Sequence, residues 1–232
     1  METLNLLCAG AAQGLVRALQ ARFEAEADAL VQGRFGAVGA MQEALRAGEP
    51  CDLMLVTQKM IDGLVASGEL RGDTRAALGR VRTGIAVRAG EPRPAVDTPE
   101  GLKAALLAAD AIYFPDPQRA TAGIHFAAVL RELGIHEQLQ PRFRNYASGA
   151  ISMREMVANA ARRSIGCTQI TEINYTPGVE LVGALPQHFE LATVYSAAVA
   201  TCAAQPVLAQ RFIALLAGPV SQALRRAGGF EL

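Results

Sequence analysis

The sequence LNLLCAGAAQGLVRALQARF, residues 4–23, decides the fold class. It opens with a mostly apolar run that stops at Gly10, and large apolar side chains then recur at Leu15, Leu19 and Phe23. Side chains four positions apart share one face of a helix. The stretch therefore predicts a strand, a turn of small residues and an amphipathic helix.

The same unit recurs along the chain. The run Leu53–Val56 is apolar without alternation, which is typical of a strand buried on both faces. Strands alternating with helices predict an α/β fold whose sheets are mostly parallel and flanked by helices. We expect strands at 4–9, 29–32, 52–56, 82–88, 111–114, 165–168, 179–182 and 193–200, and helices at 39–47, 58–68, 99–109, 121–134, 152–160, 206–217 and 220–227.

Composition narrows the class of protein. The 232 residues carry 22 Lys+Arg and 22 Asp+Glu, so no basic stripe is expected and nucleic acid is a poor partner. No apolar run approaches the ~20 residues that span a bilayer, so membrane insertion is not expected. The chain opens without a basic segment and an apolar signal region, which predicts a cytoplasmic location, or a periplasmic one if a signal peptide has been removed. We also expect a monomer.

Metal and cofactor motifs do not occur. The four cysteines lie apart without a CxxC pair, and the three histidines share no ligand spacing. No GxGxxG or phosphate-binding loop is present either. We therefore expect no metal and no cofactor, and we interpret the cysteines as small buried hydrophobes: Cys8, Cys51, Cys167 and Cys202.

Four expected strand-to-helix turns consist largely of small residues. They are residues 9–11, 36–39, 120–123 and 147–150. The free amides at a helix start and the positive end of its dipole bind anions, and small side chains let a ligand approach the backbone. Such turns also serve simply as tight connections. Four of them in one chain favour a cleft for a small anion at the carboxyl ends of the strands.

A few side chains are candidates to assist. Arg119 offers a bidentate contact to a carboxylate, although a solvent-facing arginine is the commoner case. His125 is a candidate anion donor or proton shuttle, and a packing role is the alternative. Neutral donors are expected at strand ends: Thr57, Tyr113, Thr168 and Gln169.

Five segments carry a resemblance to a known family: FGAVGAM (35–41), GEPCDL (48–53), YFPDP (113–117), AGI (122–124) and IGCTQI (165–170). Together they resemble the molybdate-type solute-binding proteins of ABC transporters. The resemblance implies a type II periplasmic-binding-protein fold, with lobe one at residues 1–82 and 194–232 and lobe two at 83–193. It also implies two crossover strands as a hinge, a ligand between the lobes and an ABC permease as partner.

The resemblance also implies the ligand contacts. Where the family has serine hydroxyls at the first two turns and a tyrosine in the second lobe, this chain has Ala11, Gly39 and Gln169. Each missing hydrogen bond costs about 1–2 kcal/mol, or roughly tenfold in affinity, so a carboxylate is favoured over molybdate. The expected contacts are Gly10, Ala11, Val38, Gly39, Thr57, Arg119, Thr121, Ala122, Ile151 and Gln169.

Three functions remain open. A binding protein that closes its lobes on a small anion is preferred. The segments 82–94 and 97–100 resemble a branch of the family that includes an aconitate isomerase, an enzyme that moves the double bond of a tricarboxylate by proton transfer. In that case His125, Tyr113 and Glu172 are the candidate proton carriers. A cytosolic anion sensor is the third alternative.

Overall fold

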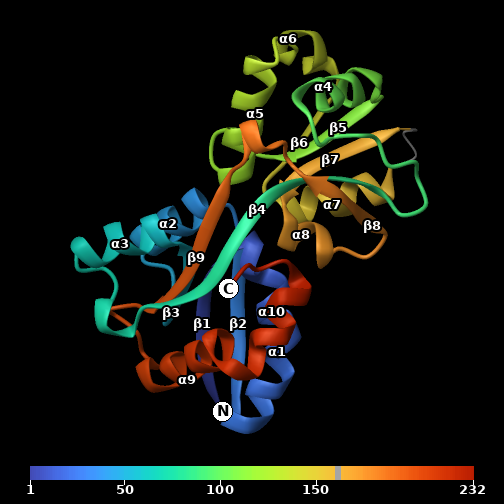
Figure 1. Ribbon diagram of the computed structural model, residues 1–232. Coiled ribbons are helices and arrows are strands. Elements are labelled where there is room, and N and C mark those ends of the chain that lie inside the picture. Colours follow the sequence, from blue (N-terminus) through green and yellow to red (C-terminus); the bar gives the residue numbers. More distant parts are fainter. Residues whose placement is uncertain (160–162) are drawn as a thin grey trace. The chain divides into compact units, whose positions relative to one another are not determined.

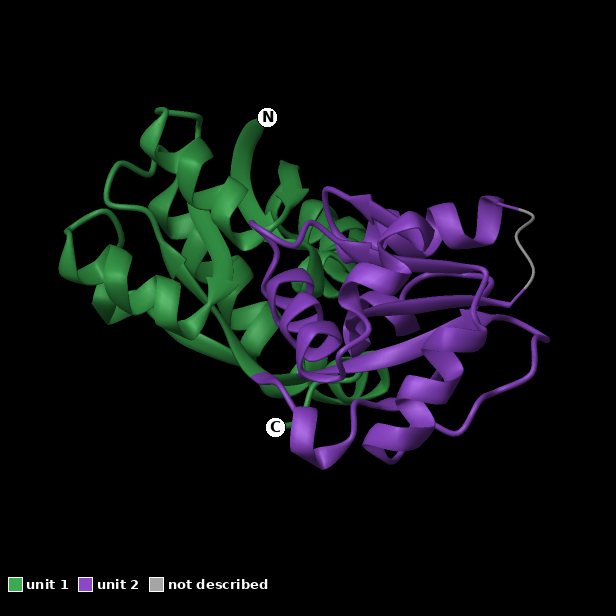
Figure 2. Ribbon diagram, turned by 90° about the horizontal axis from the view of Figure 1, so that it is seen from above, with its two compact units in different colours: residues 1–81, 193–232 green, residues 82–192 purple. Residues whose placement is uncertain are grey.

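The computed structural model describes residues 1–159 and 163–232 (Figure 1). The chain folds into two compact units, shown in separate colours in Figure 2. Unit 1 consists of residues 1–81 and 193–232, and unit 2 of residues 82–192.

Unit 1 has parallel strands β1, β2 and β3, with β9 antiparallel to β3, in the order β2-β1-β3-β9-β4. The connections from β1 to β2 and from β2 to β3 run in opposite directions along the sheet. Right-handed crossovers therefore put α1 and α2 on opposite faces, as Figure 1 shows. The elements are β1 (Glu2–Ala9), α1 (Gly10–Ala27), β2 (Ala29–Gly36), α2 (Val38–Arg46), β3 (Leu53–Thr57), α3 (Gln58–Ala66), η1 (Gly72–Thr74), the first part of β4 (Ala76–Arg88), β9 (Ala192–Val199), α9 (Pro206–Ala217), η4 (Pro219–Ser221) and α10 (Gln222–Gly228).

Unit 2 has parallel strands β5, β6 and β7, and β4 is antiparallel to β7 and to β8. The strand order is β4-β7-β5-β6, with β8 also paired to β4. The elements are α4 (Pro99–Ala108), β5 (Ala111–Pro115), α5 (Thr121–Glu132), α6 (His136–Leu139), η2 (Gln140–Arg142), β6 (Phe143–Tyr146), α7 (Gly149–Ala158), β7 (Ser164–Gln169), α8 (Ile170–Asn174), β8 (Val179–Ala184) and η3 (Gln187–Phe189).

Two apolar clusters lie on opposite faces of the sheet of unit 2. One contains Ile165 and Cys167 of β7 with Phe126 of α5. The other contains Tyr113 of β5 with Met153 of α7. Figure 1 accordingly shows α4 and α5 on one side of this sheet and α7 and α8 on the other.

The α/β fold expected from the sequence is confirmed. Leu15, Leu19 and Phe23 are buried on one face of α1, and the Phe23 ring lies 4.5 Å from that of Phe212 in α9. Thr98 caps α4, since its hydroxyl accepts from the Gly101 amide at 3.0 Å. The helix expected at 152–160 is α7, and its expected end at Ala160 lies outside the described residues.

Other expectations need correction. The long central strand β4 begins at Ala76, six residues earlier than expected, and contains Gly79 at a φ of 139°, a break that hides the strand in the sequence. The short elements β6, α6 and α8 were not expected at all. The interpretation of all four cysteines as buried is wrong for Cys202, which is exposed in the loop between β9 and α9.

No single helix among the described residues is both long and apolar enough to cross a membrane. The helical segments 206–217 and 219–228 have the length and apolar composition of a membrane span only when they are taken together, and a 46° bend separates them. Within unit 1, α9 buries Leu208, Phe212 and Leu216. Buried core helices pass the same test.

A buried carboxylate connects the loops of unit 1. Asp52 is 1% exposed, and its Oδ2 accepts from the Asn5 backbone amide at 2.8 Å and the Asn5 side chain at 3.2 Å. Its Oδ1 accepts from the Gln205 amide at 2.8 Å. One side chain therefore joins β1, the start of β3 and the loop before α9.

Replacing Asp52 by Ala should lower the free energy of unfolding by about 3 kcal/mol, because two half-buried backbone donors lose a charged acceptor. Urea unfolding measures the change. Asp73→Ala is the control, since Asp73 is 69% exposed in an ion pair with Arg71 and its loss should cost under about 0.5 kcal/mol. Equal stability of the two variants would contradict this account of Asp52.

Candidate functional site

The carboxyl ends of the parallel strands of unit 1 meet at one edge of its sheet. Ala9 at the end of β1 pairs with Gly36 at the end of β2, and Cys8 pairs with Leu55 of β3. The helices α1 and α2 begin directly after these strands, and no side chain caps either of them. The expected contacts Gly10, Ala11, Val38 and Gly39 are the first two residues of these helices, so their amides lie together at this edge.

Thr57, the neutral donor expected in unit 1, is the N-cap residue of α3. The Thr57 hydroxyl caps α3 by accepting from the Met60 amide at 3.4 Å. Beside it, the buried Ser196 of β9 donates to Gln58 Oε1 at 2.5 Å. Ser196 was missed in the sequence because it lies inside an apolar strand, where no turn marks it.

The carboxyl ends of β5, β6 and β7 form the corresponding edge of unit 2. Helix α5 begins at Thr121 and carries no side-chain cap, so Thr121 and Ala122 stand at an open helix start. Gly123 lets this start approach the end of β5, because a Cβ there would overlap the carbonyl oxygens of Pro115 and Asp116. A hollow of about 430 Å³ opens beside it, lined by residues 116–118 and 145–147.

Buried polar atoms without partners lie at the same edge. Gln169 ends β7 at 2% exposure, and neither its Nε2 nor its Oε1 has a hydrogen-bond partner among the described residues. The hydroxyls of Thr83 and Thr171 are in the same situation. Because buried polar groups are almost always paired, each of these atoms needs an explanation, and a missing ligand is one. Thr83 and Thr171 were not expected from the sequence, which offers no motif for them.

The second helix start of unit 2 is already occupied. Glu172 of α8 is 6% exposed, and its carboxylate accepts from the Ala150 amide at 3.2 Å and from the Gly149 amide at the start of α7. It also accepts from the Thr168 hydroxyl and the Gln169 amide. Burial raises the pKa of Glu172, and these hydrogen bonds oppose the rise.

The other expected residues do not converge. Arg119 is exposed, and its amide donates to Asp116 Oδ1 at 3.2 Å. The Ile151 amide donates to the capping hydroxyl of Ser148 at 3.4 Å. His125 Nε2 lies 2.7 Å from the Phe189 carbonyl oxygen, on the sheet face that faces away from Glu172.

Tyr113 was expected at a strand end, and this is wrong. It lies in the middle of β5, is 2% exposed and is parallel to Tyr146 at 6.5 Å. Burial raises the pKa of its phenol. The three candidate proton carriers are therefore divided between the two faces of the sheet, with His125 on one face and Tyr113 and Glu172 on the other.

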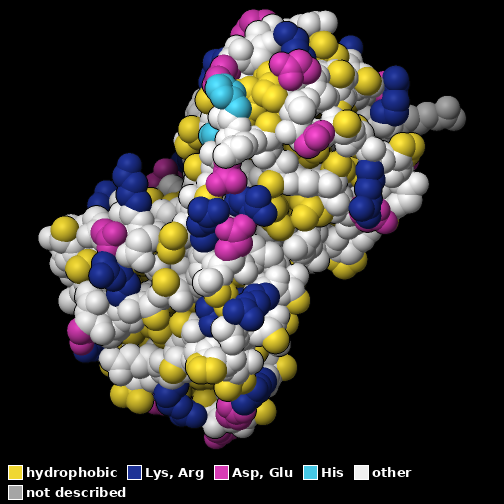
Figure 3. Space-filling model, in the orientation of Figure 1, with side chains coloured by type: hydrophobic (Ala, Val, Ile, Leu, Met, Phe, Trp, Pro, Cys, Tyr) yellow, Lys and Arg dark blue, Asp and Glu magenta, His cyan; other side chains and the backbone are white. Residues whose placement is uncertain are grey.

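Many of the arginines form ion pairs with nearby carboxylates. Ion pairs join Arg46 to Glu69 at 3.1 Å and Arg93 to Glu180 at 2.8 Å. Figure 3 shows acidic and basic side chains interspersed on the visible face. Within residues 1–159 and 163–232, no group of three or more His, Cys, Asp or Glu is placed to hold a metal ion.

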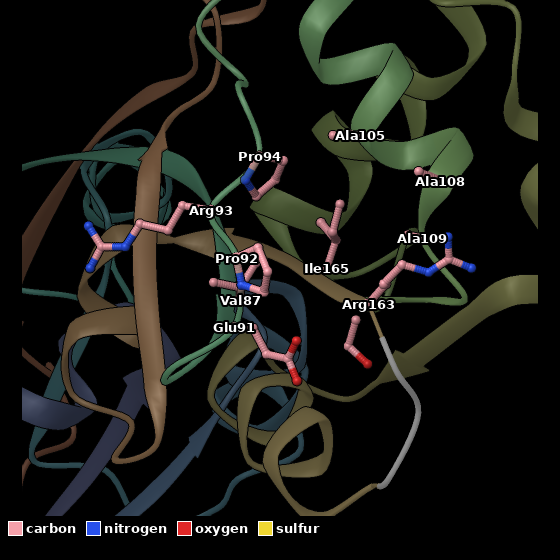
Figure 4. Close-up of a pocket in the computed structure, with 11 residues that line it drawn as sticks. Val87, Glu91, Pro92, Arg93, Pro94, Ala105, Ala108, Ala109, Arg163 and Ile165 are labelled. Atoms are coloured by element: carbon pink, nitrogen blue, oxygen red, sulfur yellow. The ribbon is translucent and has the colours of Figure 1, made fainter.

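A separate apolar pocket of about 240 Å³ lies in unit 2 (Figure 4). It is bounded by α4 and the segment 91–94, with Val87 and Ile165 among its lining residues. Ser164 and Ile165, which both line the pocket, are the first two residues of β7, whereas Gln169 is the last. The pocket is therefore at the opposite end of the strand from the candidate site.

The chain matches the family model described as "Bacterial extracellular solute-binding protein" over residues 4–231, and it belongs to that family. Among curated proteins, an aconitate isomerase from Pseudomonas sp. is 27% identical over 225 residues, which cover 94% of this chain and 83% of the relative.

Solved structures with the same fold include three anion-binding proteins or transporters. The periplasmic molybdate-binding protein of Azotobacter vinelandii superposes with a TM-score of 0.80 at 20% identity, covering 99% of each chain. The sulfate-binding protein SubI of Mycobacterium tuberculosis gives 0.75 at 18% identity, covering 99% of this chain and 86% of that one. A tungstate ABC transporter structure from Geobacter sulfurreducens gives 0.67 at 17% identity, covering 97% and 98%. The chain has the fold of type II periplasmic binding proteins, as the sequence predicted.

Gly149 should be intolerant of any side chain. A Cβ there would overlap Thr168 Oγ1 and Glu172 Oε2, so Gly149→Ala should lower the free energy of unfolding by about 2–3 kcal/mol in urea unfolding. The matched control is Gly63→Ala in α3, where a Cβ meets nothing within 4 Å. That variant should gain about 0.5–1 kcal/mol. A neutral Gly149→Ala would show that the carboxylate does not fill the start of α7.

The raised pKa of Glu172 gives a pH dependence with a defined sign. The folded protein holds this proton more tightly than the unfolded chain, so ionisation favours unfolding. As the pH rises from the ordinary value of 4.5 through the folded pKa, wild-type stability should fall relative to Glu172→Gln, by up to about 1.4 kcal/mol per pH unit. Urea unfolding of both proteins across pH 4–8 measures the difference. A difference that stays constant, or that changes with the opposite sign, would refute the raised pKa.

Proposed function

We propose that this solute-binding protein captures a small anion, an organic carboxylate, between its two units acting as lobes. The observation that carries the proposal is the set of uncapped helix starts of α1, α2 and α5 at the carboxyl edges of their sheets. Backbone amides at a helix start suit negative charge without requiring a basic side chain. A chain of net charge zero is compatible with such a site.

The proposed contacts are amides first and side chains second. In unit 1 they are Gly10, Ala11, Val38 and Gly39, with Thr57 at the neighbouring strand end. In unit 2 the amides of Thr121 and Ala122 start α5, and Gln169 contributes its side chain. Arg119 and Ile151 are secondary, because the first is exposed and the amide of the second donates to Ser148.

Several observations favour a carboxylate over a metal oxyanion. Ala11 and Gly39 carry no hydroxyl, so a tetrahedral oxyanion would lack side-chain donors at the starts of α1 and α2. A relative with 27% identity is named an aconitate isomerase, which acts on a tricarboxylate. The solved structures with the same fold support anions as a class.

The family also suggests how the protein is used. Capture by hinge closure, with β4 and β9 as the crossover strands, fits a protein that delivers its ligand to an ABC permease. The family description calls such proteins extracellular, which supports the periplasmic location that we propose. We also propose that the protein acts as a monomer.

An isomerase of the aconitate type is the second candidate, favoured by the named relative. The buried carboxyl of Glu172, whose pKa is raised, is then the proton carrier with most support from its surroundings. Deuterium incorporation into trans-aconitate in deuterated water tests this candidate. Exchange that disappears in Glu172→Gln would establish it, and the absence of exchange with any tricarboxylate would exclude it.

A thermal-shift screen tests the binding function directly. The panel is molybdate, tungstate, sulfate, citrate and the two aconitates. A ligand present at 100 times its dissociation constant adds about 2.7 kcal/mol of stability. We expect a carboxylate to raise the melting temperature most. A shift with molybdate alone would overturn the carboxylate assignment, and no shift with any anion would overturn anion binding.

A carboxylate placed at the start of α5 should repel the ligand without harming the fold. Thr121→Glu puts a negative charge at the first position of the helix, where acidic side chains are favourable. The anion that stabilises the wild type should bind at least about tenfold more weakly in titration calorimetry. Gln187→Glu makes the same charge change at an exposed position of unit 2 and should leave affinity unchanged. Equal affinities of the two variants would exclude the start of α5 from the site.

A further inference from the structure

We propose that Gln169 and Thr83 form a neutral recognition pair that selects a carboxylate carrying a hydroxyl group over one that carries only carboxylates. This inference rests on the proposed function and adds the chemical class of the ligand. It begins from three buried atoms without partners among the described residues: Nε2 and Oε1 of Gln169 and Oγ1 of Thr83.

The two side chains lie on one face of the sheet. Gln169 of β7 is directly opposite Thr83 of β4 in an antiparallel pair, and directly opposite residues project to the same side. Alternation along each strand puts them on the face of Ile85 and Cys167, which pack in the same apolar cluster as Phe126 of α5. These two side chains therefore lie on the face of the sheet that α5 covers, and at the edge where α5 begins.

On the opposite face, α8 also carries a buried hydroxyl without a partner among the described residues, that of Thr171. There the start of α7 is filled by the carboxylate of Glu172, which the Thr168 hydroxyl also contacts. The start of α7 is therefore satisfied within the chain, whereas the start of α5, on the face of Gln169 and Thr83, has no side-chain cap from its N-cap residue Ala120.

The polar atoms of the Gln169 side chain determine which hydrogen-bonding groups a ligand must offer. Its amide group has two donor hydrogens on Nε2 and acceptor lone pairs on Oε1. A fully ionised carboxylate or tetrahedral oxyanion can only accept hydrogen bonds. It therefore pairs with Nε2 of Gln169 but leaves Oε1 without a donor and close to the negatively charged oxygens of the ligand. A hydroxyl both donates and accepts, and it satisfies Oε1 while the Thr83 hydroxyl or Nε2 donates to it. A ligand that leaves a buried polar atom of the protein without a partner binds more weakly than one that pairs every such atom, so the unpaired atom discriminates between the two ligands.

Two ligand pairs that differ by one hydroxyl test the proposal: citrate against tricarballylate, and malate against succinate. Titration calorimetry of the full chain should show that the hydroxylated member of at least one pair binds about tenfold tighter or more. Gln169→Met, which keeps the length of the side chain and removes its polar atoms, should abolish the preference. Thr83→Val should reduce it, and Gln187→Met at an exposed position should keep it.

Stability controls separate recognition from folding. Replacing unpaired buried polar atoms by apolar atoms of similar shape should not lower the melting temperature of the free protein. Should Gln169→Met fail to fold, Thr83→Val carries the test.

The outcomes distinguish failure of the recognition pair from failure of the proposed function. Three results would overturn the recognition pair and leave anion binding in place. They are equal binding within both ligand pairs, tighter binding of an oxyanion than of any of the four acids, and a preference that survives in both Gln169→Met and Thr83→Val. No binding by any carboxylate or oxyanion overturns the proposed function itself, and the recognition pair with it.

Discussion

One buried carboxylate, that of Glu172, determines how the ligand edge of unit 2 is built. It accepts hydrogen bonds from the start of α7 and from the end of β7, and it projects from α8. The contact requires Gly149, since any Cβ there would overlap the carboxylate. Because this interaction fixes the turn of chain after β7, it also fixes Gln169, whose buried side-chain nitrogen and oxygen have no hydrogen-bond partner among the described residues. The start of α7, which could otherwise bind an anion, is thus satisfied by a carboxylate of the same chain, whereas the start of α5 has no side-chain cap from its N-cap residue.

The same principle explains how a neutral chain can bind a charged solute. The positive partial charge comes from backbone amides at the starts of α1, α2 and α5, and so it does not appear in the balance of 22 basic and 22 acidic residues. The arginines of surface ion pairs such as Arg46–Glu69 and Arg93–Glu180 are locally compensated. In the proposed site, the small side chains of Gly10, Ala11 and Gly39 serve this purpose by letting a ligand approach the backbone amides.

Much of the fold was predictable because its strands and helices alternate with clear apolar periodicity, as at Leu15, Leu19 and Phe23. The beginning of β4 was not, since Gly79 interrupts its pattern. The helix starts of the site were predictable from turns of small residues. The capping role of Glu172 and the unpaired hydroxyl of Thr83 were not, because they depend on contacts between segments 22 and 86 residues apart in sequence. Tyr113 and His125 are misleading in sequence, since burial and packing decide their surroundings.

The central claim is that backbone amides at helix starts hold the ligand. It is tested most directly by following the ¹⁵N–¹H amide resonances of the isotopically labelled protein while the anion that stabilises it most is titrated in. The account predicts that the largest shifts, saturating with a single affinity, belong to amides at the starts of α1, α2 and α5: Gly10, Ala11, Val38, Gly39, Thr121 and Ala122. Saturating shifts confined to other parts of the chain, such as the pocket beside α4, would contradict it.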